Sequence, residues 1–435
     1  RDLPGVVTFR DMFDVESMLR KAADGGRHAV VIGGGLLGLE AANGLAVNGM
    51  KVTVIHLMGT IMERQLDEAA GFLLQRELEG RGISVMTNAD TKAILGDDHV
   101  TGVLLKDGRE IPADLVVMAV GIRPSTGLAK SAGLAVERGV VVDDHMVTSD
   151  PAILAVGECV QHRGATYGLV APLWEMARVC ADQLAGRRDS AYAGSVTSTK
   201  LKVTGIDVFS AGDFGGGKDC EDIVFRDAAR GVYKRIVLKG DRIAGAVLYG
   251  DTRDGAWYFQ MLREAENVAP LRETLIFGPG FGGQGFGGAA ANPKAAVAAL
   301  SDSAEICGCN GVCKGAITRA IADKGLTTLD DVRSHTKASA SCGSCTGLVE
   351  QLLELTLGDG YQAAAAAKAT ASAARLAANA GPAVERRVRS DEGAGDERDG
   401  IATAISRSGP AAQSQRSDVC MVGSGERRPL DYPER

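Results

Sequence analysis

A short apolar segment that runs through a glycine turn into a run of helix-forming residues constrains this chain most. The turn carries Gly33, Gly35 and Gly38 in the G-x-G-x-x-G spacing, after residues 29–32 and before residues 36–47. The first glycine permits a tight turn, the second lets a pyrophosphate approach the backbone, and the third lets the helix pack on the strand. Because a second apolar strand is expected over 52–57, the segment predicts a βαβ unit that binds a dinucleotide.

The predicted helix begins where the phosphates of that dinucleotide would lie. Unpaired backbone N–H groups and the positive end of the helix dipole both favour an anion at such a position. We therefore expect coenzyme contacts from the turn and from the first helical residues: Gly33, Gly35, Leu36, Leu37, Gly38 and Glu40.

The choice between NADH and NADPH stays open at the end of the second strand. An acidic residue often binds the adenosine ribose of NADH there, but this chain has His56. Arg64 either binds the 2′-phosphate of NADPH or is an exposed arginine at a helix start. A third strand (83–86), a β-meander (91–111) and an apolar strand (114–120) follow, and the turn that begins at Gly121 closes the unit.

Gly157 and Glu158 form a second candidate nucleotide contact. Residues 153–156 predict an apolar strand, and a carboxylate after such a strand and a glycine is placed to accept a hydrogen bond from a ribityl or ribose hydroxyl. The alternative is that Glu158 caps a helix. If the nucleotide bound there is a flavin, the start of the helix predicted over 170–184 would place its positive dipole end near the flavin ring.

The remaining segments before residue 290 carry no further motif. Residues 6–9 predict a strand, and residues 14–23 predict a helix capped by Asp14. Strands are predicted over 200–209, 222–225, 233–238 and 242–249, with a helix over 256–264. Seven of the eleven residues from 278 to 288 are glycine, which predicts a flexible linker.

Paired cysteines predict a metal centre after this linker. The pairs are Cys307 with Cys309 and, after a further 32 residues, Cys342 with Cys345. We expect each pair at the start of a short helix, whose positive end offsets the negative charge of the thiolates. The spacing favours a [2Fe–2S] cluster, and zinc is the alternative because C-x-x-C pairs also bind zinc. Cys313 is interpreted as a buried or bystander thiol.

Composition limits the environment and the partners. The chain has 435 residues, a net charge of −7 and no basic block in its ordered part, so we expect no binding to nucleic acid or to an anionic membrane. No apolar run reaches the length of a membrane span. Five of the nine cysteines lie between residues 307 and 345, rather than spread as in a disulfide framework, which favours a reducing, cytoplasmic compartment.

The two ends of the chain differ from its middle. The sequence starts without Met, so we expect a fragment. Beyond Tyr361 it becomes rich in Ala, then in Arg, Ser, Gly, Asp and Glu without periodicity, and it contains the isolated Cys420. A disordered tail and a shifted reading frame both fit this composition.

Residues 5–361 resemble one family, the flavin-containing large subunit of bacterial assimilatory NAD(P)H nitrite reductase. The segments that carry the resemblance are the glycine turn 31–40 and residues 62–67 (MERQLD), 119–124 (AVGIRP), 155–159 (AVGEC), 167–173 (YGLVAPL) and 199–205 (TKLKVTG). The cysteine segment resembles the [2Fe–2S] domain of bacterioferritin-associated ferredoxin.

The resemblance implies an α/β fold of the pyridine nucleotide-disulfide oxidoreductase type, Rossmann-like with two dinucleotide-binding domains, together with a small α+β domain and a small helical [2Fe–2S] domain. It divides the chain into the end of a first FAD-domain segment (1–26), an NAD(P)-binding domain (27–122), a second FAD-domain segment (123–190), an α+β reductase domain (195–275), a glycine-rich linker (276–303), the [2Fe–2S] domain (304–360) and the tail (361–435).

The family's activity implies a path for electrons. They pass from NAD(P)H to FAD, then to the [2Fe–2S] cluster, and then to a sirohaem and [4Fe–4S] centre that reduces nitrite to ammonium. The first FAD glycine motif and the sirohaem domain are not found in this sequence, so we expect an electron-input part that binds FAD weakly. The implied partners are a small-molecule electron donor and a nitrite reductase small subunit or another redox protein, with a possible homodimer.

Two other hypotheses remain at this stage. The chain also resembles stand-alone electron-transfer reductases, such as a rubredoxin reductase or the flavin subunit of assimilatory nitrate reductase. A hypothesis of a different class is a redox sensor that acts only through its cluster.

Overall fold

A computed structural model describes residues 3–187, 189–201, 203, 205–279, 297–341, 343, 345–358 and 361. All of these residues fall within one compact unit, residues 1–376. The predicted ligand Cys342, most of the predicted glycine-rich linker, Cys420 and the tail beyond Tyr361 lie outside the described residues.

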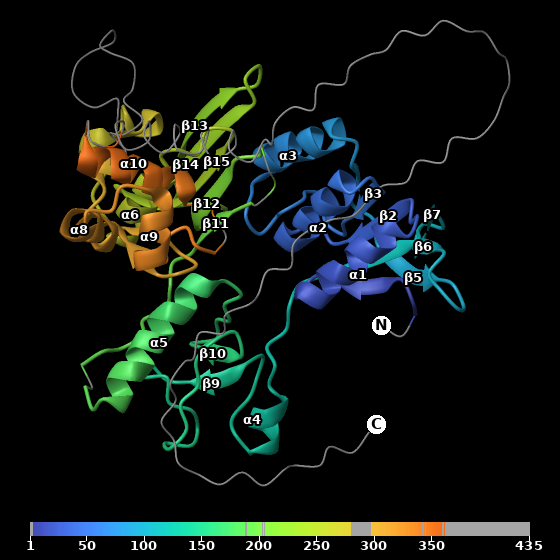
Figure 1. Cartoon of the computed structure of the whole chain (residues 1–435), viewed down its shortest axis with the longest axis horizontal. Helices are drawn as coiled ribbons and strands as arrows, with labels where there is room; N and C mark the ends of the chain where they lie inside the picture. The colour runs from blue at the N-terminus through green and yellow to red at the C-terminus, as the bar shows by residue number, and fades with distance from the viewer. Residues whose placement is uncertain are drawn as a thin grey trace, which may run out of the picture. The chain divides into compact units, whose positions relative to one another are not determined.

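A five-stranded parallel sheet carries the glycine turn. In spatial order its strands are β1 (Val6–Thr8), β8 (Leu115–Met118), β2 (His28–Ile32), β3 (Lys51–Ile55) and β4 (Ser84–Met86). Helix α2 (Leu36–Val47) connects β2 to β3, and α3 (Glu68–Gly80) connects β3 to β4 (Figure 1). The βαβ unit predicted from the glycine spacing is confirmed.

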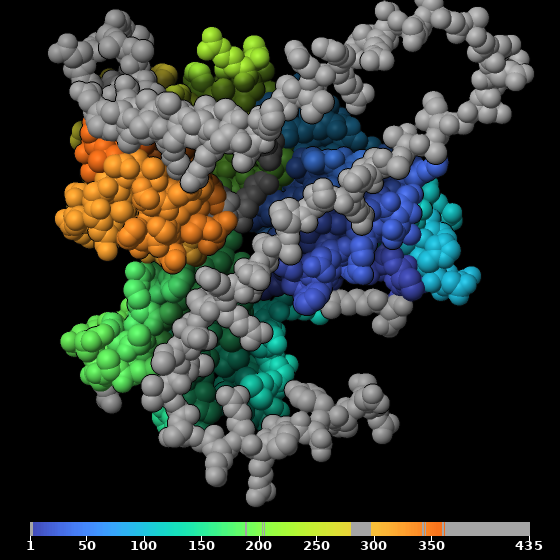
Figure 2. All heavy atoms as spheres, viewed as in Figure 1, coloured from blue at the N-terminus to red at the C-terminus, as the bar shows by residue number. Residues whose placement is uncertain are grey.

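Alternate residues of this sheet belong to two different hydrophobic cores, because successive side chains of a strand point to opposite faces. Val31 and Val117 are buried with apolar residues of α2 and α3. Val30 and Val116 are buried on the other face with residues of the predicted β-meander. The meander consists of β5 (Thr91–Leu95), β6 (Gly102–Leu105) and β7 (Glu110–Pro112), and its cyan atoms adjoin the blue ones in Figure 2.

The first helix, α1 (Met12–Ala23), begins before the predicted position. Asp11 is its N-cap, and Asp11 Oδ1 accepts a hydrogen bond from the backbone N–H of Asp14 at 3.0 Å. The carboxylate of Asp14 instead accepts hydrogen bonds from the Thr8 hydroxyl and the Arg10 backbone N–H. The prediction of Asp14 as the cap was therefore wrong, because the sequence offers two aspartates and the hydrogen bonds of the preceding segment select between them.

The segment after the sheet contains α4 (Gly127–Ser131), a two-stranded parallel pair of β9 (Val140–Val142) and β10 (Val160–His162), and α5 (Val170–Leu184). The strand predicted over 153–156 is wrong. Only Leu154 pairs there, through an isolated bridge to Val147. Consequently Glu158 lies in a turn before β10 rather than at the carboxyl end of a strand.

A second sheet is antiparallel. In spatial order it contains β11 (Ser198–Lys200), β12 (Val208–Gly212), β15 (Arg242–Tyr249), β14 (Val232–Lys239) and β13 (Glu221–Asp227). Helix α6 (Gly255–Arg263) and the 3₁₀ turns η1 (Ala269–Leu271) and η2 (Leu275–Phe277) follow it. The single strand predicted over 200–209 is wrong: it is two antiparallel strands separated by a turn in which Ile206 N–H donates to Val203 C=O at 3.0 Å.

The cysteine segment is small and mostly helical. A hairpin of β16 (Glu305–Cys307) and β17 (Val312–Cys313) leads into α8 (Lys314–Lys324), α9 (Leu329–Thr336) and α10 (Thr346–Leu357). Helix α9 starts with a capping box formed by Thr328 and Asp331. The centre of the cysteine segment contains the fully buried side chains of Ile317, Val332 and Val349. In the part of the chain that the structure describes, no helix has the length and apolar character needed to cross a membrane.

Asp67, at the start of α3, joins the two large sheets. Its Oδ1 accepts a hydrogen bond from the backbone N–H of Ala70 at 3.0 Å, which caps the helix. Its Oδ2 accepts from the Tyr233 hydroxyl at 2.6 Å and from Arg235 Nη1 at 3.3 Å, both on β14. Burial raises the pKa of Tyr233, so this hydroxyl keeps its proton and donates a hydrogen bond to Asp67. One carboxylate thus fixes a helix start and a contact between sheets.

We expect Asp67→Ala to lower the free energy of unfolding by about 2–3 kcal/mol, because the N-terminus of α3 loses its cap, Tyr233 loses its acceptor and Arg235 keeps only its contact with Asp222. Urea unfolding measures the change. The neighbouring Glu68 is exposed, and Glu68→Ala should change the same free energy by less than about 0.5 kcal/mol. Equal effects of the two substitutions would show that the shared carboxylate contributes nothing specific.

Candidate functional site

The glycine turn is shaped by close backbone contacts. Gly33 has a φ of +118°, and a Cβ there would collide with the carbonyl oxygen of Ala119. A Cβ on Gly38 would collide with the carbonyl oxygen of Gly33, so helix α2 lies directly against the turn. Gly35 is different, since no atom of the described residues lies within 4 Å of the position that its Cβ would take. The second glycine therefore borders open space.

The start of α2 can bind a phosphate. Gly35 is the N-cap residue and no side chain caps the helix, so the first backbone N–H groups, those of Leu36 and Leu37 among them, have no capping side chain as acceptor. Together with the open space beside Gly35, this fits the pyrophosphate of a dinucleotide. Glu40 lies one turn further along α2 and is partly buried. Gly121, with a φ of +98°, is exposed in the loop after β8.

His56 is buried against the glycine turn rather than pointing outward at the strand end. The backbone N–H of Gly34 donates to His56 Nδ1 at 3.0 Å, and His56 Nε2 lies 3.0 Å from Glu63 Oε2. Arg64, the other residue considered for coenzyme choice, has a side chain that is 85% exposed. Glu63 was not among the residues predicted from the sequence. Its position in the loop after the coenzyme-binding strand was the feature that could have indicated it.

The second nucleotide contact predicted from the sequence, Gly157 and Glu158, lies in a turn. Gly157 has a φ of +109° and open space around its Cβ position. The carboxylate of Glu158 is paired with the guanidinium of Arg10. A ribityl hydroxyl would therefore meet a carboxylate that Arg10, in the segment before α1, already orients. Helix α5 also starts without a capping side chain, which leaves its N–H groups available to a flavin carbonyl or ring nitrogen.

Three of the four predicted cluster ligands are described, and they come together. The Sγ atoms of Cys307 and Cys309 are 3.6 Å apart, and none of the described cysteines forms a disulfide. A hydrogen bond with the Cys345 thiol lowers the pKa of Cys307 to about 5, with further contributions from the backbone N–H of Ser339 and from Cys309. Cys307 is thus ready to act as a thiolate ligand.

The local structure around these cysteines differs from the prediction for one pair. Cys307 and Cys309 belong to the β16–β17 hairpin and not to a helix start, whereas Cys345 is the N-cap residue of α10. Cys313, the interpreted bystander, is the N-cap residue of α8. Among the described residues no three His, Cys, Asp or Glu side chains already form a metal-ligand group, and Cys342 is outside that set.

Asn310 and Trp174 complete the surroundings of the cysteine hairpin. Asn310 Nδ2 lies 3.7 and 3.8 Å from the sulfurs of Cys307 and Cys309 and donates to the Lys337 carbonyl at 2.7 Å. Trp174, on α5, donates from its indole N–H to the carbonyl of Cys309 at 3.3 Å. Sequence analysis missed both residues, since neither has a motif and their roles depend on tertiary contacts.

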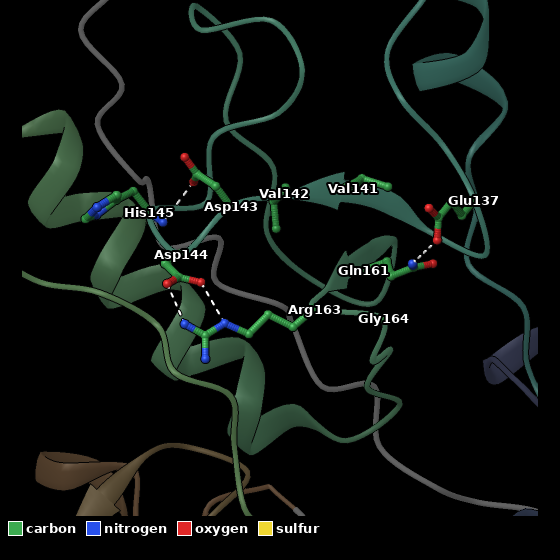
Figure 3. A pocket seen from close by; sticks show the side chains of 9 residues that line it. All are labelled: Glu137, Val141, Val142, Asp143, Asp144, His145, Gln161, Arg163 and Gly164. Atoms are coloured by element: carbon green, nitrogen blue, oxygen red, sulfur yellow. Dashed lines mark hydrogen bonds and ion pairs between the residues drawn. The ribbon is translucent and has the colours of Figure 1, made fainter.

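A cavity of about 610 Å³ lies on the β9–β10 pair (Figure 3). Its polar lining is internally paired: Asp144 with Arg163, and Gln161 with Glu137. The hydrogen bonds from Arg163 and His162 lower the pKa of Asp144 to about 2. None of the lining residues belongs to the glycine turn or to the cysteine segment, so this cavity is separate from both candidate sites.

Three family models match consecutive parts of the chain. Residues 2–181 match the pyridine nucleotide-disulphide oxidoreductases, residues 198–266 the C-terminal domain of rubredoxin NAD⁺ reductase, and residues 305–354 the BFD-like [2Fe-2S] binding domain. The cofactors that these assignments support are NAD(P)H and FAD for the first part and a [2Fe–2S] cluster for the last.

Curated relatives are similar over most of this chain. A nitrite reductase [NAD(P)H] of Bacillus subtilis is 48% identical over 364 residues, 84% of this chain and 44% of the relative. An assimilatory nitrate reductase electron transfer subunit of the same species is 40% identical over 83% of this chain and 45% of the relative. The chain thus spans less than half the length of these relatives.

Solved structures support the same fold. A ferredoxin reductase from Rhodopseudomonas palustris aligns with a TM-score of 0.57 and 27% identity, over 62% of this chain and 67% of that one. Residues 2–181 thus match the pyridine nucleotide-disulphide oxidoreductases, and the chain is similar to NAD(P)H nitrite reductases over most of its length, as its sequence resemblance predicted.

Proposed function

We propose that this chain is the electron-input part of an NAD(P)H-dependent nitrite reductase, moving electrons from NAD(P)H through FAD toward a [2Fe–2S] cluster. The observation that carries the proposal is the hydrogen bond from the Trp174 indole to the Cys309 carbonyl. It joins the cysteine hairpin to α5, the helix whose start is expected to face the flavin. Coenzyme turn, flavin segment and cluster ligands thus belong to one connected structure.

The residues of the chain divide the work between binding and electron relay. The N–H groups at the start of α2 and the open space beside Gly35 would bind the coenzyme pyrophosphate, and Gly121, Gly157 and Glu158 would border the cofactors. FAD, when bound, accepts a hydride from NAD(P)H and releases its two electrons singly, which a one-electron cluster can accept. Cys307, Cys309, Cys342 and Cys345 would hold that cluster, with Asn310 near two of the sulfurs.

The electron donor, the electron acceptor and the compartment of the protein are part of the same proposal. The small-molecule donor is NAD(P)H, and the electron acceptor beyond the cluster is a redox protein or domain, for which a sirohaem domain or a nitrite reductase small subunit is the candidate. We place the protein in the cytoplasm, where thiols stay reduced, with a homodimer as its possible assembly. The predicted domain boundaries remain part of this proposal.

A stand-alone electron-transfer reductase is the second candidate, and the 40% identical electron transfer subunit favours it. The two candidates share the path from NAD(P)H to the cluster and differ in the final acceptor. The two candidates are separated by expressing the protein from its complete native gene and measuring NADH oxidation with nitrite as the sole acceptor. Nitrite-dependent oxidation supports nitrite reductase. No oxidation with nitrite, together with intact reduction of ferricyanide, supports the second candidate.

The chain purified under anaerobic conditions should contain about two irons and two acid-labile sulfides. We expect Cys345→Ser to remove most of both, because Cys345 contacts Cys307 directly. Cys313→Ser is the matched control and should retain both. Metal and sulfide analysis measures the content, and zinc without sulfide would contradict the [2Fe–2S] assignment.

The glycine turn gives a separate prediction. Gly35→Val should weaken coenzyme binding by about tenfold or more, because the new side chain fills the space that the pyrophosphate needs. Gly44→Val is the matched control: Gly44 lies on the same helix, is exposed and also has nothing within 4 Å of its Cβ position. Isothermal titration with NADH and with NADPH provides the dissociation constants, and unchanged binding in Gly35→Val would mean that the turn is structural only.

A further inference from the structure

We infer that Glu63, held in place by His56, is the carboxylate that receives the adenosine ribose of the coenzyme, and that the chain consequently prefers NADH to NADPH. The inference rests on the proposed binding of NAD(P)H at the glycine turn. It names Glu63 as a specificity-determining residue and His56 as a positioning residue, although His56 stands at the strand end where an acid is usual.

The hydrogen bonds of His56 define its tautomer. A backbone N–H can only donate, so His56 Nδ1, 3.0 Å from the N–H of Gly34, must accept. The ring proton is then on Nε2, which donates to Glu63 Oε2 at 3.0 Å. In this arrangement the imidazole is neutral. It orients the carboxylate of Glu63 without adding a positive charge; the exposed Arg64, whose Nε lies 3.9 Å from Glu63 Oε1, is the cation that pairs with this carboxylate.

The second oxygen of Glu63 remains available. Glu63 Oε1 lies 3.9 Å from Arg64 Nε, too far for a hydrogen bond, and the Glu63 side chain is 32% exposed. Within the described residues, the hydrogen bond with His56 is the only one that the Glu63 side chain makes. Glu63 therefore presents one fixed and one open carboxylate oxygen, and the open oxygen can accept from a ribose hydroxyl.

Backbone contacts hold the Glu63 loop beside the glycine turn. The backbone N–H of Met62 donates to the carbonyl of Gly34 at 2.9 Å, and Met62 has a φ of +53°, which is unusual for a residue other than glycine. Gly34 itself has no room for a side chain, since a Cβ would lie 2.9 Å from His56 Cγ and 2.8 Å from Ile61 Cγ2. The turn that would bind the pyrophosphate and the loop that carries Glu63 are thus one unit.

This geometry discriminates between the two coenzymes by charge. The ribose 2′-hydroxyl of NADH can donate to Glu63, whereas the 2′-phosphate of NADPH would bring a like charge to a carboxylate that the neutral His56 does not compensate. Arg64 is the competing residue, but its side chain is 85% exposed, and the ion pair that it makes among the described residues is the 3.9 Å contact with Glu63. An ion pair with so exposed a cation contributes little.

The test measures dissociation constants of NADH and NADPH for the full chain by anaerobic isothermal titration. The wild-type protein should bind NADH at least about tenfold more tightly than NADPH. Glu63→Gln keeps the shape of the side chain and removes its charge, so the ratio of the two constants should fall by about tenfold, mainly through tighter NADPH binding. Glu68→Gln removes the same charge from an exposed position five residues away and should leave the ratio unchanged.

The role of His56 has its own readout. His56→Leu removes both hydrogen bonds and should lower the ratio of the NADPH dissociation constant to the NADH dissociation constant. The amide of His56→Gln can accept and donate, so this variant should retain more of that ratio. The ratio in the wild-type protein should also decrease as salt increases, because the repulsion is electrostatic. A structural role of His56 alone would weaken both coenzymes equally.

The other outcomes overturn the inference in distinguishable ways. Equal affinities that Glu63→Gln does not change would reject the role of Glu63 and leave the proposed function intact. Tighter NADPH binding that Arg64→Gln abolishes would assign the ribose site to Arg64. If the wild-type chain binds neither coenzyme, the inference and the proposed function both fail.

Discussion

The contact between Gly38 and the carbonyl of Gly33 is the constraint on which the rest of the nucleotide-binding half depends. No residue with a side chain can occupy position 38 at that separation, so helix α2 reaches the turn only because the position is glycine. This approach aims the start of α2, without a side-chain cap, at the open space beside Gly35. The same compactness brings Gly34 against His56 and so extends the constraint to the loop after β3.

Sequence patterns predicted elements well where local chemistry decides them. The parallel strands, α2 and the meander follow from apolar periodicity and turn residues, and the structure confirms them. The predictions failed where individual hydrogen bonds decide. Residues 153–156 are apolar enough for a strand but pair only at Leu154, and Asp11 rather than Asp14 caps α1 because the Asp14 carboxylate is used by Thr8 and Arg10.

The candidate sites show the same division. The glycines and cysteines were found from spacing because their chemistry requires fixed residue types at fixed intervals. Glu63, Asn310 and Trp174 were not predicted, because each is defined by contacts that no sequence motif indicates. Asp67 belongs to this group as well, since its hydrogen bonds to β14 join segments more than 160 residues apart.

A protein that receives hydride from a coenzyme and releases single electrons must hold two separate sites in fixed positions relative to each other. In this chain the glycine turn lies on a parallel sheet, and two of the proposed cluster ligands, Cys307 and Cys309, lie on a hairpin that accepts a hydrogen bond from Trp174 of α5. The low pKa of Cys307 follows from hydrogen bonds made within the cysteine segment, so the ligands are prepared locally. The position of that segment depends on contacts outside it, among them the Trp174 hydrogen bond, the packing of Trp257 of α6 and the hydrogen bond from the Ser301 N–H to Gln260. Ligand chemistry and electron-transfer geometry are therefore set by different residues and can be altered separately.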